Sequence, residues 1–133
     1  MIHLVTGGSG SGKSAYAEQC ILDFGGTRRV YIATMQPFGA EGQARIARHR
    51  KMRAAKKFST IECYTNLKEV ELEPGSDVLL ECMSNLTANE IFDPSGAGKA
   101  RTEEEILAGV YRLANQARNL VLVTNEIFSD GYR

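Results

Sequence analysis

The chain has 133 residues and no net charge, with 16 basic and 16 acidic side chains. Its 43% hydrophobic content is typical of a folded protein, and its length fits one domain over residues 1–133. Zero net charge argues against a nucleic-acid partner. No apolar run approaches the roughly 20 residues that span a bilayer, and Met1 leads directly into a predicted strand, so we expect a cytoplasmic protein.

Predicted strands and helices alternate along the chain. Residues 2–6 form a short apolar run that predicts a buried strand, and a helix follows over 12–24. Beyond it we expect strands at 29–34, 59–63, 77–80 and 120–124, and helices at 41–55, 84–92 and 102–118. Thr102 and Glu105 have capping-box spacing at the start of the last helix. Apolar strands separated by helices predict an α/β fold with a mostly parallel sheet covered on both faces.

The strongest motif is the phosphate-loop sequence GGSGSGKS at residues 7–14, between the first strand and the first helix. Glycines allow the backbone to turn sharply, so that successive N–H groups point inward around an anion. The helix adds the positive end of its dipole. Lys13 is expected to contact the β and γ phosphates and Ser14 to bind Mg²⁺. The predicted contacts are Gly7, Gly8, Ser9, Gly10, Ser11, Gly12, Lys13 and Ser14.

A phosphate-loop site also needs an acid at the end of a neighbouring strand, to order Mg²⁺ or its waters. Glu81 follows the apolar run 78–80 and is the candidate. A solvent-facing acid at a strand end is the alternative. Glu126 ends the strand at 120–124 in the same way and is a weaker candidate, for sensing the γ phosphate or for contacting the substrate.

The predicted helix at 41–55 carries most of a basic cluster, and His49 lies within that cluster. On a helix, His49 lies one turn from Arg45 and one turn from Arg53. Neighbouring arginines disfavour the imidazolium form, which would leave a nucleophilic ring. Such a ring can attack phosphorus and carry a nucleotidyl group, although the residues alone favour a histidine on a solvated basic helix. The basic residues are Arg45, Arg48, Arg50, Lys51, Arg53, Lys56 and Lys57.

These motifs together resemble the bifunctional adenosylcobinamide kinase / adenosylcobinamide-phosphate guanylyltransferase family of cobalamin biosynthesis. The matching segments are LVTGGSGSGKS at 4–14, YIAT at 31–34, RIARHRKMR at 45–53, TIE at 60–62, LLECMSNLTAN at 79–89 and LVTNE at 122–126. The phosphate loop occurs in many families, but the combination is far more specific. The resemblance implies a P-loop NTPase-type, RecA-like fold. It also implies that a C-terminal part is missing, because relatives continue beyond NEIFSDG.

The resemblance also implies two reactions and a set of site residues. A nucleoside triphosphate, ATP or GTP, phosphorylates adenosylcobinamide, and GMP from GTP is then transferred to the phosphate through a guanylylated histidine, at the position of His49. Mg²⁺ would be held by Ser14 and Glu81, and the enzyme would be a homo-oligomer. Besides the phosphate loop, the implied nucleotide contacts are Ala33, Thr34, Met35, Arg50, Lys51, Met52, Arg53, Glu62 and Glu81.

Two other functions remain open from the sequence. A simple P-loop kinase would use the basic helix only to clamp phosphates and would form no covalent GMP adduct. A non-catalytic GTP-binding remnant, or a nucleic-acid-associated ATPase, would use the basic residues at 45–57 to contact a polyanion.

Overall fold

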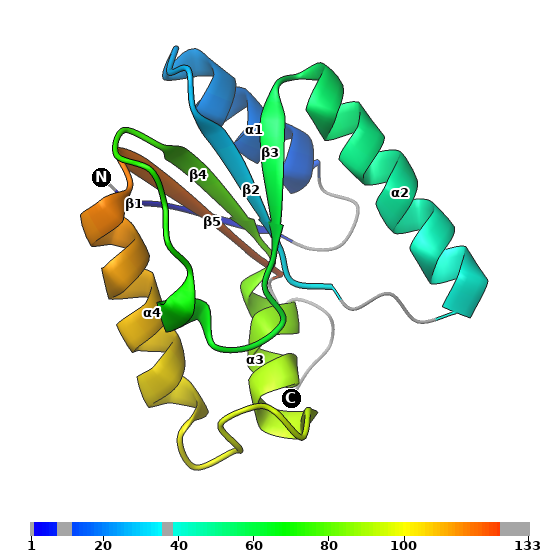
Figure 1. Cartoon of the computed structure of the whole chain (residues 1–133), viewed down its shortest axis with the longest axis vertical. Helices are drawn as coiled ribbons and strands as arrows, with labels where there is room; N and C mark the ends of the chain where they lie inside the picture. The colour runs from blue at the N-terminus through cyan, green and yellow to red at the C-terminus, as the bar shows by residue number, and fades with distance from the viewer. Residues whose placement is uncertain (1, 8–11, 36–38, 126–133) are drawn as a thin grey trace.

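The computed structural model describes residues 2–7, 12–35 and 39–125, and it contains a five-stranded parallel sheet with helices on both faces (Figure 1). The α/β fold predicted from the sequence is therefore confirmed. In chain order the elements are β1 (Ile2–Gly7), α1 (Lys13–Asp23), β2 (Arg29–Ala33), α2 (Gly39–Ala55), β3 (Phe58–Glu62), the 3₁₀ helix η1 (Leu67–Glu69), β4 (Asp77–Glu81), α3 (Met83–Phe92), α4 (Thr102–Gln116) and β5 (Asn119–Asn125).

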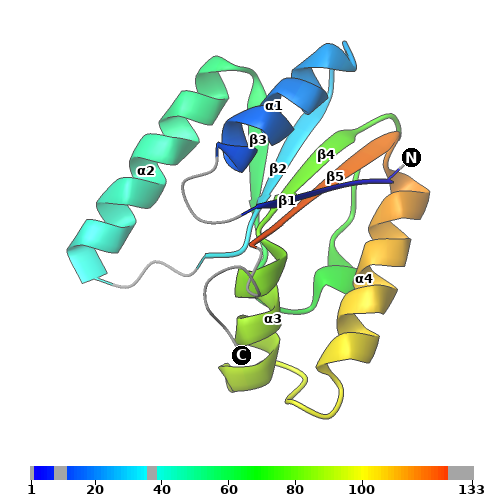
Figure 2. The same ribbon diagram turned by 180° about the vertical axis from the view of Figure 1, so that it is seen from behind.

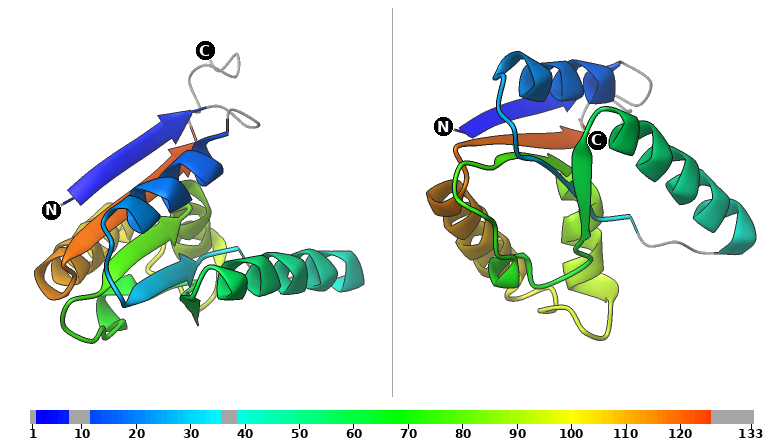
Figure 3. Two further views of the ribbon diagram at one scale, coloured as in Figure 1. Left: turned by 90° about the horizontal axis from the view of Figure 1, so that it is seen from above. Right: turned by 45° about the horizontal axis from the view of Figure 1, so that its top comes forward.

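Two apolar layers sandwich the sheet, because successive side chains of a strand point to opposite faces. On β4, Leu79 packs with Ala17 and Ile21 of α1. Val78 and Leu80 instead join the cluster formed with α3, α4 and η1. Figure 3 shows α1 on one side of the sheet, α3 and α4 on the other, and α2 projecting beyond β3.

The strand order is β1-β5-β4-β2-β3, so β5 lies between the strand that enters the phosphate loop and the strand that ends at Glu81. This insertion is the RecA-like arrangement implied by the resemblance. The register aligns Val5, Val123, Glu81, Ala33 and Glu62 in one row across the sheet. In Figures 1 and 2 the carboxyl ends of the strands lie beside the beginning of α3. Residues from all the strands can therefore contribute to one site at this edge.

Two predictions about burial were wrong. The first strand was expected to be buried, but β1 forms an edge of the sheet, and Leu4 is 63% exposed. Because the described chain ends soon after the last predicted strand, we also expected one face of that strand to be poorly covered, yet Leu120, Val121 and Val123 of β5 are fully buried. Tertiary pairing explains both results, because β5 lies between β1 and β4 while β1 has a strand on one side only within the described residues.

The predicted capping box at the start of α4 was also wrong. The N-cap residue is Arg101, and Thr102 donates its hydroxyl hydrogen to the carbonyl of Gly98 at 2.7 Å. Glu105 pairs with Lys68 and Arg101 instead of capping the helix. A tertiary partner on η1 therefore replaced the local interaction that the spacing suggested.

None of the helices in the described part of the chain combines the length and the apolar character needed to cross a bilayer.

Candidate nucleotide-binding site

The beginning of α1 has the geometry that an anion-binding helix terminus requires. Gly12 precedes the helix with φ 82°, a left-handed conformation that residues with a side chain rarely adopt. The first turn of α1 contains no acidic residue, so the helix itself supplies no carboxylate that would offset the positive end of its dipole. Lys13 is the first residue of the helix and is half-buried. The predicted contacts Gly8, Ser9, Gly10 and Ser11 lie outside the described residues.

Glu81 ends β4 on the face of the sheet that α1 covers, because it lies two residues after Leu79, a contact of α1, and so shares its face. The Tyr31 hydroxyl of β2 donates a hydrogen bond to Glu81 Oε1 at 3.0 Å. Burial, together with the negative charge of Glu81, raises the pKa of Tyr31 far above its usual value. The phenol therefore stays protonated and remains a donor that fixes the carboxylate.

Arg53 of α2 stacks its guanidinium group on the ring of Tyr31. Its guanidinium carbon lies 3.5 Å from the centroid of the Tyr31 ring, and only 7% of the residue is exposed. A cation above an aromatic face is stabilised by the ring quadrupole. Tyr31 thus joins Arg53 and Glu81, two predicted nucleotide contacts that come from different elements.

Thr34 follows β2 and has no exposed surface. Its hydroxyl oxygen lies 3.1 Å from the Glu81 carbonyl and 3.0 Å from the Cys82 carbonyl, and it accepts a hydrogen bond from the Cys82 N–H at 2.8 Å. Asn89 of α3 donates to the Thr34 carbonyl at 2.7 Å. Thr34 therefore ties the ends of β2 and β4 together, and this tie fixes the backbone that carries Glu81.

Arg50 and Glu62, two further predicted contacts, form an ion pair between α2 and β3. They border a hollow of about 370 Å³, here called the smaller hollow. Both side chains are about half exposed and so remain accessible to a ligand. The smaller hollow is lined by Arg50, Ala54, Phe58, Thr60 and Glu62.

The other predicted site residues take up varied positions. Lys51 is exposed on α2, and Ala33 and Met35 are partly buried at and just after the end of β2. His49 lies in α2, one helical turn before Arg53. Ser14 and Met52 are helical residues of α1 and α2, and for these two and His49 the structure describes the backbone only. Glu126 lies outside the described residues.

The described residues contain no group of three or more His, Cys, Asp or Glu side chains arranged to hold a metal ion. A phosphate-loop magnesium site does not need such a cage, because Mg²⁺ takes only one or two protein oxygens and keeps waters and phosphate oxygens. The Glu81 carboxylate at the strand end supplies a hard oxygen donor of this kind. The donor set therefore fits Mg²⁺ held jointly with a bound nucleotide.

Tyr31 is the residue that sequence reasoning missed. It was seen only as part of an aromatic, β-branched strand. The available signal was its position two residues before the end of β2, on the same face as Ala33 in the row with Glu81. The contact between Tyr31 and Glu81 can be inferred from that position only when β2 is known to pair with β4.

This fold and this edge of the sheet define a P-loop nucleotide-binding protein of the α/β class. Residues 3–132 match the family model described as cobinamide kinase / cobinamide phosphate guanyltransferase, CobU. The chain is 35% identical over 140 residues to the bifunctional adenosylcobalamin biosynthesis protein CobU of Escherichia coli, and equally to that of Salmonella typhimurium. Each alignment covers 96% of this chain and 76% of the relative. The chain belongs to the CobU family.

Proposed function

We propose that this chain phosphorylates adenosylcobinamide with a nucleoside triphosphate and then transfers GMP from GTP to the resulting phosphate. The chief support is membership of a family whose description contains both activities. The described geometry agrees with it, because the beginning of α1, Glu81 and the Arg50–Glu62 pair belong to one edge of the sheet. Residues 1–133 are proposed to act as one nucleotide-binding domain.

In the kinase step, the hydroxyl of the aminopropanol arm would attack the γ phosphorus. The bond from that phosphorus to the bridging oxygen breaks, the nucleoside diphosphate leaves, and the hydroxyl proton passes to solvent water. Lys13 and the phosphate-loop N–H groups would stabilise the charge on the phosphoryl oxygens. Mg²⁺, held by Ser14 and Glu81, would neutralise the β and γ phosphates. Tyr31 would keep the Glu81 carboxylate oriented.

In the transferase step, a ring nitrogen of His49 would attack the α phosphorus of GTP. A nitrogen–phosphorus bond forms, the bond to the β-phosphate oxygen breaks, and pyrophosphate leaves. A phosphate oxygen of adenosylcobinamide phosphate then attacks the same phosphorus, which gives adenosylcobinamide-GDP and restores the histidine. The buried Arg53 and the ion-paired Arg50 lie near His49 in the sequence of α2, and their cationic groups would offset the triphosphate charge.

The test of this step is incubation with α-labelled GTP and Mg²⁺, followed by intact-mass analysis. We expect wild type and the exposed-arginine control Arg48→Ala to gain one GMP. His49→Ala should gain none, while it still binds Mg-GTP and retains kinase activity. Labelling of the alanine variant would exclude His49 as the nucleophile. Phosphorylation without labelling of wild type would instead favour a P-loop kinase that performs no nucleotidyl transfer.

We propose a homo-oligomer that acts in the cytoplasm, where ATP and GTP are available. The balanced charge of the chain argues against a nucleic-acid partner. Sedimentation of the purified protein, and a search for salt-sensitive RNA or DNA binding, test these two statements.

A further inference from the structure

A second hollow lies beyond the carboxyl end of β3, with a volume of about 590 Å³. We call it the acidic hollow. It opens on the opposite face of β3 from the smaller hollow, because Ile61 and Cys63 alternate with Thr60 and Glu62 along the chain. Its size is within the range of ordinary ligand pockets. The lining consists of Ile61, Glu62, Cys63, Tyr64, Thr65, Asn66, Glu69, Val70, Asp93 and Ser95.

The charge of this lining is one-sided. Glu62, Glu69 and Asp93 contribute carboxylates, and none of the described lining residues is Lys, Arg or His. The carboxylates raise the cost of placing a polyphosphate here, because like charges repel. Tyr64 and Val70 add apolar surface, while Thr65 and Asn66 offer neutral polar groups. The hollow therefore suits a ligand that is cationic or amide-rich and has a large apolar body.

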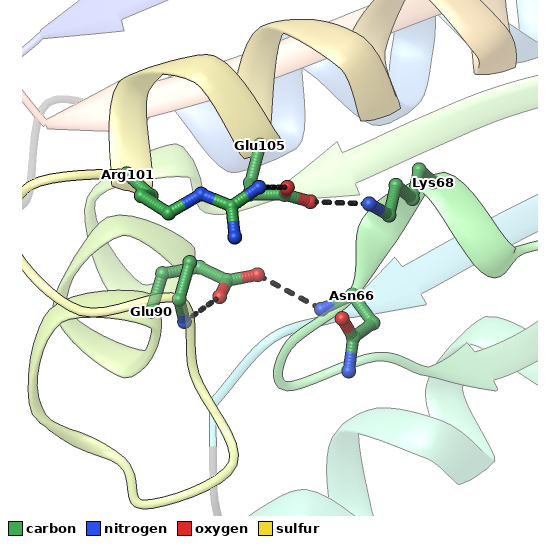
Figure 4. A network of polar contacts seen from close by, with 6 residues as sticks. Asn66, Lys68, Glu90, Arg101 and Glu105 are labelled. Atoms are coloured by element: carbon green, nitrogen blue, oxygen red, sulfur yellow. Dashed lines mark hydrogen bonds and ion pairs between the residues drawn. The ribbon is translucent and has the colours of Figure 1, made fainter.

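A buried carboxylate outside the hollow holds two of its walls in place. Glu90 of α3 is 2% exposed. Its Oε2 accepts a hydrogen bond from the Asn66 N–H at 2.8 Å, and its Oε1 accepts one from the Ala97 N–H at 2.9 Å (Figure 4). These bonds join the segment before η1 to the segment after α3, so both walls are positioned without a ligand.

A separate ion-pair chain ties η1 to α4. Lys68 of η1 pairs with Glu105 at 2.8 Å, and Arg101 pairs with the other oxygen of the same carboxylate at 3.2 Å (Figure 4). The hydrogen bond from Lys68 holds the pKa of Glu105 below its usual range, so the carboxylate stays charged near neutral pH. These ion pairs therefore hold η1, which carries Glu69, against α4.

The acidic hollow adjoins the predicted nucleotide site. Glu62 lines both hollows. In the sheet register Glu62 is two strands from Glu81, which corresponds to roughly 10 Å. A substrate as large as a corrinoid can occupy the hollow at one end and extend along this edge toward the triphosphate.

We infer that the acidic hollow binds the corrinoid substrate, by an edge of the macrocycle that carries its amide side chains. This inference rests on the proposed function. Cobalt(III), the corrin anion and the alkyl ligand leave adenosylcobinamide a cation, and its side chains end in primary amides. The carboxylates complement that charge and accept amide hydrogens, while Tyr64 and Val70 contact the macrocycle. ATP and GTP bind on the other side of β3. The carboxylates of the acidic hollow therefore repel the nucleotide and attract the corrinoid, which keeps the two substrates in separate sites.

The test compares Glu69→Lys with Glu104→Lys, an identical charge reversal at an exposed position of α4 away from the hollow. Steady-state kinase assays at saturating Mg-ATP give the KM for adenosylcobinamide, and calorimetry gives the Kd for Mg-GTP. We expect Glu69→Lys to raise the KM roughly threefold to tenfold, the size of effect expected for one exposed charge, without changing the Kd. Glu104→Lys should match wild type in both measurements.

The outcomes separate the two proposals. If wild type fails to phosphorylate adenosylcobinamide, the proposed function is wrong. If wild type is active but both lysine variants share its KM, the corrinoid binds elsewhere and this inference is overturned. An equal loss of Mg-GTP affinity in Glu69→Lys would also overturn it, because the hollow would then serve the nucleotide. Thermal melting of both variants identifies any general loss of folding.

Discussion

The two hollows on opposite faces of β3 differ in charge and in how their walls are held. The smaller hollow has an arginine from α2 opposite Glu62, and beyond it Arg53 is stacked on Tyr31. The acidic hollow has carboxylates and no cation among its described lining residues. A single edge strand can therefore separate an anionic from a cationic substrate, since each face presents its own side chains.

The supports of the two hollows also differ. The side near α2 depends on contacts between side chains of separate elements, as in the pairs of Arg50 with Glu62 and Arg53 with Tyr31. The walls of the acidic hollow depend on main-chain N–H groups bonded to the buried Glu90. The first kind of contact can rearrange when a nucleotide binds, whereas breaking the second kind leaves the buried Glu90 carboxylate without its hydrogen-bond donors, which is costly. The acidic hollow should thus be the more rigid of the two.

Removing the charge of the phosphate-loop lysine should give the largest effect and should affect only the nucleotide side. Lys13→Met is expected to lower kcat/KM for ATP by a factor on the order of 10²–10³, because a cation that stabilises the transferring phosphoryl group is lost. Binding of adenosylcobinamide should stay near the wild-type value. Lys99→Met, at an exposed lysine, is the control. Equal loss of both substrates would contradict the separation of the two sites.

The next largest effect concerns the walls of the acidic hollow. Glu90→Ala leaves the N–H groups of Asn66 and Ala97 without their acceptor, so the free energy of unfolding should fall by about 2–3 kcal/mol. Denaturant unfolding measures this change, with the exposed Glu103→Ala as control. The folded variant should bind Mg-GTP normally but show a higher KM for adenosylcobinamide. A stability equal to that of the control would mean that Glu90 does not brace these walls.

A smaller effect is expected from the phenol that connects Arg53 and Glu81. Tyr31→Phe removes the hydrogen bond to Glu81 and keeps the ring, so the kinase kcat should fall roughly fivefold, or about 1 kcal/mol. The Mg²⁺ concentration for half-maximal activity should rise with it. Tyr31→Leu also removes the aromatic face beneath Arg53 and should weaken Mg-GTP binding further. Identical behaviour of the two variants would show that the ring contributes nothing.

The smallest effect is a pH dependence of stability from a thiol in the acidic hollow. Burial, with the Glu90 charge, raises the pKa of Cys63 from 9.0 to about 11. Between these values the unfolded chain releases the thiol proton while the folded chain keeps it, so stability falls as pH rises. We expect wild type to lose roughly 1 kcal/mol more than Cys63→Ala between about pH 8 and pH 10. Denaturant unfolding at both pH values checks this, and parallel curves would contradict the raised pKa.

Much of the fold could be predicted because its signals are local. Apolar runs bounded by glycine or polar residues placed every strand and α-helix within about three residues of the observed bounds, whereas the 3₁₀ helix η1 was not predicted. The phosphate-loop spacing also placed Lys13 at the beginning of α1, preceded by a glycine in a left-handed conformation. Burial was predicted less well. The apolar sequence of β1 could not show that Leu4 lies at an edge, since that depends on which strands pair.

The residues of the candidate site also fall into those that the sequence identified and those that only the structure revealed. Glu81 was named from its position at a strand end, and Arg50, Arg53 and Glu62 were implied by the family resemblance; the structure brings all four to one edge of the sheet. Glu90 and Tyr31 were not named, because their roles depend on partners 24 and 50 residues away. The capping box failed for the same reason, since Glu105 bonds to Lys68 of η1.

The sequence by itself determined the alternation of strands and helices and the chemistry of the phosphate loop, because both depend on side chains a few positions apart. Only the tertiary structure decided the strand order, the Tyr31 bridge between Glu81 and Arg53, and the two hollows beside β3, one with an ion pair and one lined by carboxylates alone among its charged residues. These features arise when segments distant in the chain pack together, and the free energy of that packing depends on several segments at once, so no single stretch of residues predicts it.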